Sequence, residues 1–187
     1  MKKNILFSLL LIISVATFSQ KTFFSIGPEL AFPGSSKSLS DNAGTGIGGS
    51  LRVESVFGKR ISGTATVGYL GFSEQELTLS GTPPTKTKVS AILIQIGTKY
   101  YPKEALTGFF VSAELGLMPT TTRFDFATNP DRTHKENGLS CAPGIGYQMG
   151  NIEAGLRLQY NLSASGFNVY YYGFRLAYSF KKKNGKK

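Results

Sequence analysis

The last apolar run of the chain, from Asn168 to Phe180, constrains the fold most, because its side chains alternate in character. The even-numbered positions from Tyr170 to Phe180 are large and apolar or aromatic, and the odd-numbered positions between them are mostly small or polar. This period of two predicts a β-strand. In a soluble sheet the apolar face meets a core, whereas in a transmembrane barrel it meets lipid and the polar face lines the lumen.

Further runs of the chain alternate in the same way, with turn-forming or polar segments between them. They are residues 22–32, 47–57, 61–72, 88–101, 109–118, 139–149 and 152–160. None has helical spacing, so the pattern predicts an all-β fold, an eight-stranded antiparallel up-and-down β-barrel. Residues 73–87 are expected to form a loop and Pro119 to Asn137 the longest irregular stretch. Pro28 and Pro143 lie within strands, where we expect bulges or irregular pairing.

The two ends of the chain differ in character from the strands between them. Lys2 and Lys3 precede an apolar stretch from Ile5 to Val15, which is typical of a secretory signal peptide. We therefore predict a removed signal peptide at residues 1–19, a barrel domain at 20–180 and a basic periplasmic tail at 181–187. This division predicts an exported protein.

The formal net charge of +10 is concentrated at the two ends of the chain. Without the signal segment and the tail, the body carries 14 basic and 11 acidic residues. This small excess argues against a nucleic-acid partner. Cys141 is the only cysteine, so no disulfide can form within the chain.

Charged residues within the strands lie almost entirely on the face of small and polar side chains. A soluble barrel of lipocalin type, with an apolar interior, does not account for this placement, whereas a narrow polar lumen does. Because buried charges persist only when they are paired, we predict an interior ion network with a structural role. Its predicted members are Glu29, Arg52, Glu54, Glu114, Glu153, Arg157 and Arg175, with Lys99 lower down the same face.

Aromatic residues collect at the strand ends on the apolar face, as expected for girdles at the two interfaces of a bilayer. The predicted lipid-interface aromatics near the short turns are Phe24, Phe57, Tyr100, Phe109, Tyr147 and Phe180. Those near the long loops are Phe32, Tyr69, Tyr160 and Tyr170. The connections also alternate between long and short, which favours a barrel with both mature termini in the periplasm.

Three stretches resemble the outer-membrane β-barrel domain family, the small porin-like barrels of Bacteroidota. They are FSIGPELAFP, APGIGYQMGNIEAGLRLQYNL and the closing YYYGFRLAYSF. The resemblance covers essentially the whole mature chain. It implies a small closed barrel that the outer-membrane assembly machinery inserts, with the terminal aromatic strand as its recognition signal. Here seven residues follow Phe180, whereas in the family's pattern the aromatic strand ends the chain.

No catalytic, metal-binding or cofactor-binding site is predicted. His134 is the only histidine, and it lies in a polar stretch with no nucleophile and orienting group in recognisable spacing. We therefore expect a non-enzymatic, monomeric outer-membrane barrel with a plugged interior and a structural or surface-interaction role, with outer-membrane lipid as its surroundings. The alternatives are a narrow channel or carrier for small solutes or hydrophobic compounds, and a soluble lipocalin-like ligand-binding barrel.

Overall fold

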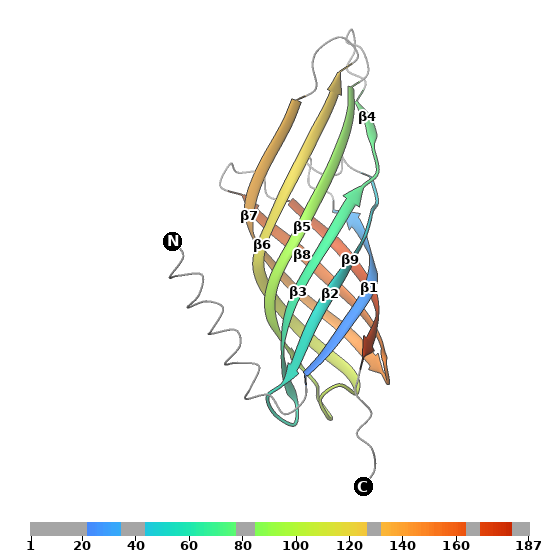
Figure 1. Ribbon diagram of the computed structural model, residues 1–187, viewed down its shortest axis with the longest axis vertical. Coiled ribbons are helices and arrows are strands. Elements are labelled where there is room, and N and C mark those ends of the chain that lie inside the picture. The colour runs from blue at the N-terminus through green and yellow to red at the C-terminus, as the bar shows by residue number, and fades with distance from the viewer. Residues whose placement is uncertain (1–21, 35–43, 78–84, 127–131, 164–168, 181–187) are drawn as a thin grey trace.

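The computed structural model describes residues 22–34, 44–77, 85–126, 132–163 and 169–180. The predicted signal peptide and the basic tail lie outside these residues. Within them the chain forms strands that follow one another up and down (Figure 1). The strands are β1 (Thr22–Pro33), β2 (Gly46–Val56), β3 (Ile61–Phe72), β4 (Gln75–Leu77), β5 (Thr85–Tyr100), β6 (Gly108–Phe126), β7 (Arg132–Met149), β8 (Ile152–Ser163) and β9 (Val169–Phe180).

Eight of these strands close into a barrel. Each pairs antiparallel with its neighbour, β3 pairs with β5, and the last strand, β9, returns to pair with β1. At this seam Phe24 lies opposite Phe180, and Glu29 lies opposite Arg175. The prediction of a closed, eight-stranded, antiparallel up-and-down barrel is confirmed. β4 is a short additional strand that pairs only with the beginning of β5.

The prediction of a long irregular stretch at Pro119 to Asn137 was wrong. β6 continues to Phe126 and β7 begins at Arg132, with pairing kept from Pro119 opposite Asn137 to Phe124 opposite Arg132. The predicted loop at 73–87 likewise contains β4 and the start of β5, and β8 runs on to Ser163. Most residues of these segments are polar, so the long apolar alternation that identified the other strands is missing there. β5, β6 and β7 therefore project beyond the rest of the barrel (Figure 1).

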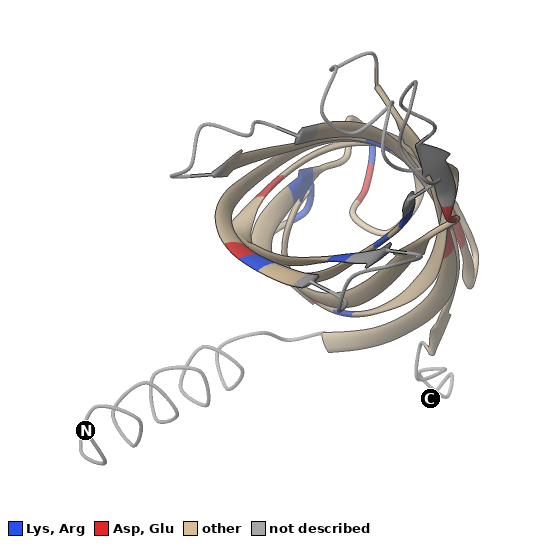
Figure 2. Ribbon diagram, turned by 90° about the horizontal axis from the view of Figure 1, so that it is seen from above, with Lys and Arg blue, Asp and Glu red and all other residues tan. Residues whose placement is uncertain are grey.

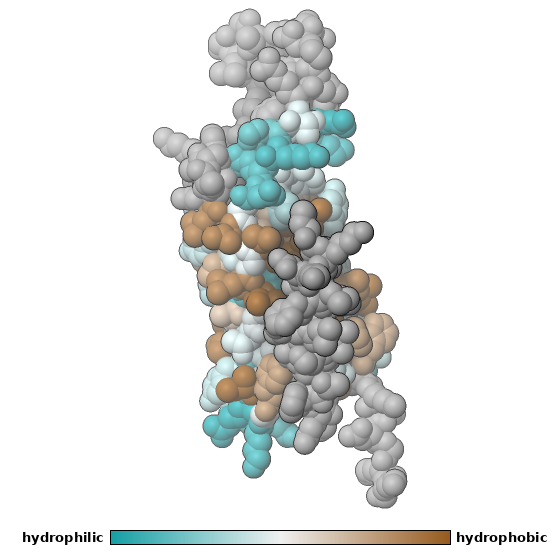
Figure 3. Space-filling model, turned by 60° about the vertical axis from the view of Figure 1, so that its left-hand side comes forward, coloured by the Kyte–Doolittle hydropathy of each residue, from teal (hydrophilic) through white to brown (hydrophobic). Residues whose placement is uncertain are grey.

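Alternate side chains of each strand face opposite sides of the wall. Large apolar residues such as Ile96, Leu115 and Leu139 are at least 60% exposed on the outer surface, whereas polar residues point inward. The exposed apolar side chains form a band at mid-height, with hydrophilic side chains toward both ends (Figure 3). No helix of the described residues is long and apolar enough to span a membrane.

The strand pairing is interrupted beside three prolines, because proline has no amide hydrogen for the ladder. The pairing of β1 with β9 skips the positions at Pro28, that of β5 with β6 skips those at Pro119, and that of β7 with β8 skips those at Pro143. The register on the two sides of each gap is unchanged. The irregular pairing expected at Pro28 and Pro143 is present without a bulge.

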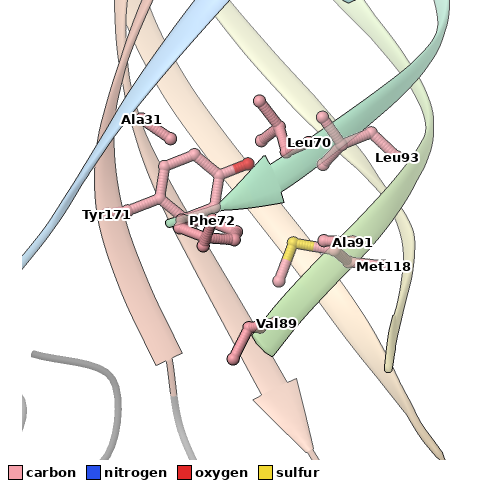
Figure 4. Packing of buried hydrophobic residues seen from close by; sticks show 8 residues of the cluster. All are labelled: Ala31, Leu70, Phe72, Val89, Ala91, Leu93, Met118 and Tyr171. Atoms are coloured by element: carbon pink, nitrogen blue, oxygen red, sulfur yellow. The ribbon is translucent and has the colours of Figure 1, made fainter. Parts of the chain in front are cut away.

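A cluster of apolar side chains fills the interior toward the end where β5, β6 and β7 project (Figure 4). Leu70, Leu93 and Tyr171 are completely buried within it. Phe72 packs edge-on against Tyr171, with ring centroids 6.0 Å apart. The full cluster is Ala31, Leu70, Phe72, Val89, Ala91, Leu93, Met118 and Tyr171.

The first prediction concerns this interior cluster. Leu70→Ala should lower the free energy of unfolding by about 2–5 kcal/mol, because it removes buried methyl groups and leaves a cavity. Leu51→Ala, on the outer surface where Leu51 is 60% exposed, is the matched control and should cost clearly less. Urea unfolding in detergent micelles, followed by circular dichroism, measures both variants. Equal midpoints for the two would contradict a packed interior at Leu70.

Candidate functional site

The most distinctive feature of the interior is a layer of charged side chains below the apolar cluster. The charged positions lie around the barrel wall (Figure 2). All seven predicted network residues point inward, and each side chain is at most 8% exposed. They come from five strands that are far apart in the sequence, and the alternation of each strand turns them toward the lumen.

Glu153 on β8 contacts three basic groups of this layer. Its Oε1 atom accepts hydrogen bonds from Arg52 Nη1 at 2.7 Å and from Arg175 Nη1 at 3.1 Å. Its Oε2 atom accepts a hydrogen bond from Lys99 Nζ at 2.7 Å. Lys99 also donates to Glu54 Oε2 at 2.7 Å, so one lysine joins two carboxylates. Charge-assisted bonds of this length are the strong ones in proteins.

The remaining members close a ring of alternating charges through Arg52 and Arg175. Arg52 Nη2 lies 3.0 Å from Glu114 Oε1, and Arg157 Nη1 lies 3.9 Å from Glu114 Oε2. Arg157 Nη2 donates to Glu29 Oε2 at 2.6 Å, and Arg175 Nε lies 3.6 Å from Glu29 Oε1. Each acidic group in the ring therefore touches two basic groups from other strands.

Lys99 is a full member of the network, although the sequence prediction left it outside the set of seven. It is completely buried, and its ammonium also lies 4.6 Å from the centre of the Phe110 ring. The signal was present in the sequence, because Lys99 has the same odd-numbered parity as the inward residues of its strand. With Lys99 included, four carboxylates face four basic groups and the network is neutral.

Hydroxyl groups donate further hydrogen bonds to the carboxylates of the network. Ser62 donates to Glu54 at 2.5 Å, and Tyr101 donates to the same oxygen at 2.9 Å. Ser50 donates to Glu29 at 2.6 Å. Thr64 and Thr66 donate in the same way to Glu114, at 3.1 Å and 3.0 Å. None of these uncharged partners was predicted, since serine and threonine on a polar strand face carry no specific signal.

Little space is left within the charged layer. The cavity among its side chains is about 20 Å³, and it is lined by Arg52, Glu114, Glu153, Arg157 and Arg175 together with neighbouring wall residues. This volume accommodates roughly one water molecule. The small volume at this level agrees with the expectation that an eight-stranded barrel is filled by its own side chains.

Nine of the predicted lipid-interface aromatics are exposed on the outer surface. Those near the short-turn end are Phe24, Phe57, Tyr100, Phe109, Tyr147 and Phe180, and those near the projecting end are Phe32, Tyr69 and Tyr160. Phe57 lies just beyond β2 in the turn. Tyr170 is only partly exposed, because it packs against Tyr160 with ring centroids 6.1 Å apart.

The residues that a hydrolytic site would need do not come together in the described part of the chain. His134 is on β7, not in a loop as predicted, and its Nε2 atom lies 2.9 Å from Glu136 Oε1. Ser140 is buried in the lumen, where it accepts a hydrogen bond from Gln95 at 3.0 Å. The described residues contain no group of three or more His, Cys, Asp or Glu side chains that could hold a metal ion.

Solved structures of outer-membrane proteins share this fold. Ail, the attachment invasion locus protein of Yersinia pestis, in complex with the heparin analogue sucrose octasulfate, matches with a TM-score of 0.60 and 12% identity, covering 86% of this chain and 98% of that one. The N-terminal β-barrel domain of Pseudomonas aeruginosa OprF matches with a TM-score of 0.57 and 10% identity, covering 87% and 99%. The sequence matches no family model and no curated protein. The fold is therefore that of the small outer-membrane barrels, and the narrower resemblance to the porin-like barrels of Bacteroidota stays a prediction.

The second prediction tests the charged layer through its lysine. Lys99→Met should lower the free energy of unfolding by about 3–5 kcal/mol, because it removes the buried ammonium that pairs with Glu54 and one of the three basic groups that contact Glu153. Lys88→Met is the matched control, since Lys88 is 62% exposed and its pair with Glu74, 3.4 Å away, is worth little. Urea midpoints in the same detergent compare the two. A Lys99→Met midpoint as high as that of the control would show that the layer is not a stabilising network.

Proposed function

We propose that the protein is an integral outer-membrane barrel with a plugged lumen, and that it acts through its surface rather than by transport or catalysis. The distribution of side chains carries this proposal. Apolar residues cover the outside, and the charged residues are paired inside. A soluble ligand-binding barrel of lipocalin type requires the opposite arrangement, an apolar interior within a water-exposed wall.

The orientation follows from the two ends of the barrel. Outer-membrane barrels have short periplasmic turns and longer extracellular loops. The end that carries Thr22 and Phe180 also has the short turns after β2 and β7, and the opposite end carries the projecting strands. This supports periplasmic termini, an extracellular β5–β6–β7 projection and insertion by the outer-membrane assembly machinery. We further propose that the barrel is monomeric, because the pairing of β1 with β9 closes the wall.

The projection offers a cationic interaction surface just beyond the apolar band. A depression of about 230 Å³ there is lined by Tyr69, Lys88, Arg123 and neighbouring serine and threonine residues. Lys88 lies directly opposite Arg123 in the pairing of β5 with β6. Like charges in this position are destabilising. Glu74 lies 3.4 Å from Lys88 and offsets that charge in part, and an anionic group in the depression would offset Arg123 as well. We infer that the surface binds anionic groups, in line with the sulfated heparin analogue in the Ail complex.

The third prediction tests the plugged lumen against the channel alternative. Wild-type protein reconstituted into planar bilayers should show no single-channel conductance, because the charged layer and the apolar cluster fill the lumen. Insertion must be demonstrated in the same preparation by protease protection and by a faster gel migration before boiling. Discrete current steps from inserted wild-type protein would favour the narrow-channel reading. A protein that remains soluble without detergent would overturn the membrane assignment itself.

The fourth prediction tests the cationic surface. Lys88→Gln combined with Arg123→Gln should weaken retention on a heparin column, so that the variant elutes at lower salt, since both positive charges are removed. Lys59→Gln combined with Lys103→Gln, at the short-turn end, removes the same charge and is the control. Equal loss of retention in the two double variants would show that net charge, and not this surface, is responsible.

A further inference from the structure

The three neighbouring strands of the projection repeat one pattern on their outward faces. After the last outward apolar residue comes an uncharged polar residue, and the next outward residue is basic. The alternate residues Val89 and Met118 are buried, which fixes the outward facing of this pattern. Its members are Ile92, Ser90 and Lys88 on β5, Pro119, Thr121 and Arg123 on β6, and Leu139, Asn137 and Lys135 on β7. Each basic residue therefore lies four positions beyond the edge of the apolar band.

Strand pairing brings the three basic residues together on one face. Lys88 lies opposite Arg123, and Lys135 lies opposite Thr121 on the strand that carries Arg123. We call Lys88, Arg123 and Lys135 the basic cluster. Among the described residues, Glu74, 3.4 Å from Lys88, is the only ion-pair partner of these three groups. Positive charge therefore remains unpaired on a hydrophilic surface directly beyond the apolar band (Figure 3).

The height of the basic cluster above the band indicates which layer of a membrane it meets. A strand rises about 3.3 Å per residue, so four positions span about 13 Å along the strand. A strand tilt of about 40° reduces this to about 10 Å along the membrane normal. The polar layer of a bilayer extends about 5–8 Å beyond the hydrocarbon on each side, and long basic side chains can reach back toward it. The three charges are therefore within reach of lipid headgroups.

The depression of about 230 Å³ lies beside this cluster and offers space for a headgroup. Tyr69, one of the predicted interface aromatics, forms one side of it and is 56% exposed. Gly71 leaves room there, because a Cβ atom at this position would lie 3.8 Å from the nearest atom, Tyr69 Cε1. Ser90 and Thr121 supply hydroxyl groups next to the basic side chains. Phosphate oxygens accept hydrogen bonds from both kinds of donor, most strongly from cationic ones.

We propose that the basic cluster binds phosphate groups of lipid headgroups in the outer leaflet. The inference deepens the proposed function and rests on its orientation, because it identifies the surrounding lipid as the source of the anionic groups. A soluble polyanion approaches most readily from beyond the tips of the projecting strands. The basic cluster instead faces sideways, on the same side of the wall as the apolar band, where lipid is the neighbour.

The fifth prediction uses the absence of tryptophan from the chain. Leu139→Trp places a single fluorophore in the apolar band below Lys135, and Phe32→Trp places one on β1, two strands away from β5. Each variant is reconstituted into phosphatidylcholine vesicles that contain a small fraction of phosphatidic acid. Bromine in the acyl chains of one lipid or the other quenches tryptophan on contact. Phosphatidic acid should be enriched at Leu139→Trp by about 5-fold or more over random mixing, the effect of one basic group near an anionic lipid, and not at Phe32→Trp.

Replacement of the basic cluster by glutamine tests the origin of the enrichment. In the Leu139→Trp background, the test variant combines Lys88→Gln, Arg123→Gln and Lys135→Gln and should return the lipids to random mixing. The matched control removes the same charge at the short-turn end and should leave the enrichment intact; it combines Lys59→Gln, Arg60→Gln and Lys103→Gln. Random mixing at Leu139→Trp with the basic cluster present, or enrichment that survives in the test variant, would overturn the lipid assignment.

Three further measurements separate this inference from its alternatives. Inorganic phosphate, added at constant ionic strength, should leave the enrichment unchanged, since acyl chains hold the lipid at the surface; its loss would indicate a site for free phosphate. Random lipid mixing with heparin retention that still depends on Lys88 and Arg123 would mean a surface for soluble polyanions, and would refute the lipid assignment alone. A protein without faster gel migration before boiling has not inserted, which would refute the proposed membrane barrel itself.

Discussion

The mutual neutralisation of buried charges is the constraint on which the rest of the structure depends. Backbone pairing joins only neighbouring strands, whereas the bond from Arg52 to Glu153 joins residues 101 positions apart and that from Arg157 to Glu29 joins residues 128 positions apart. These contacts join strands that are not neighbours in the barrel wall. Because every member touches at least one opposite charge, the loss of one weakens the pairing of its buried neighbours.

The same charges also specify the register of the closing seam. Glu29 lies opposite Arg175 where β1 meets β9. A slip of one residue in a strand would turn its inward face outward, which would place these charges among the apolar residues of the band. The correct register thus satisfies two requirements at once, since it pairs the charges and leaves the band uninterrupted. The same register of β1 with β9 therefore closes the barrel and pairs its interior charges.

The fold was predictable from the sequence because each strand inside the apolar band alternates with a period of two. The same signal predicted which residues turn inward, as Arg52 and Glu153 illustrate. The prediction of strands failed where the alternation between apolar and polar positions ends. Beyond the band both faces of β6 and β7 are polar, so segments such as Thr120 to Thr122 carried no periodicity, although their branched side chains suit strands. Which carboxylate meets which basic group depends on the curvature of the closed wall, so the parity of Lys99 indicated that it faces the lumen but not that it pairs with Glu54 and Glu153.

The prolines show that a break in the ladder does not by itself open the wall. Beside Pro28, a Cβ atom at Gly27 would lie only 2.6 Å from the Cα atom of Ala177, so β1 and β9 remain in close contact across the seam. Beside Pro143, the outward side chains of Ile145, Leu156 and Tyr172 border a shallow apolar depression. Both prolines remove a backbone donor, so the difference arises from the side chains around them. A missing ladder hydrogen bond therefore alters the outer surface only as far as the neighbouring outward side chains leave space above it.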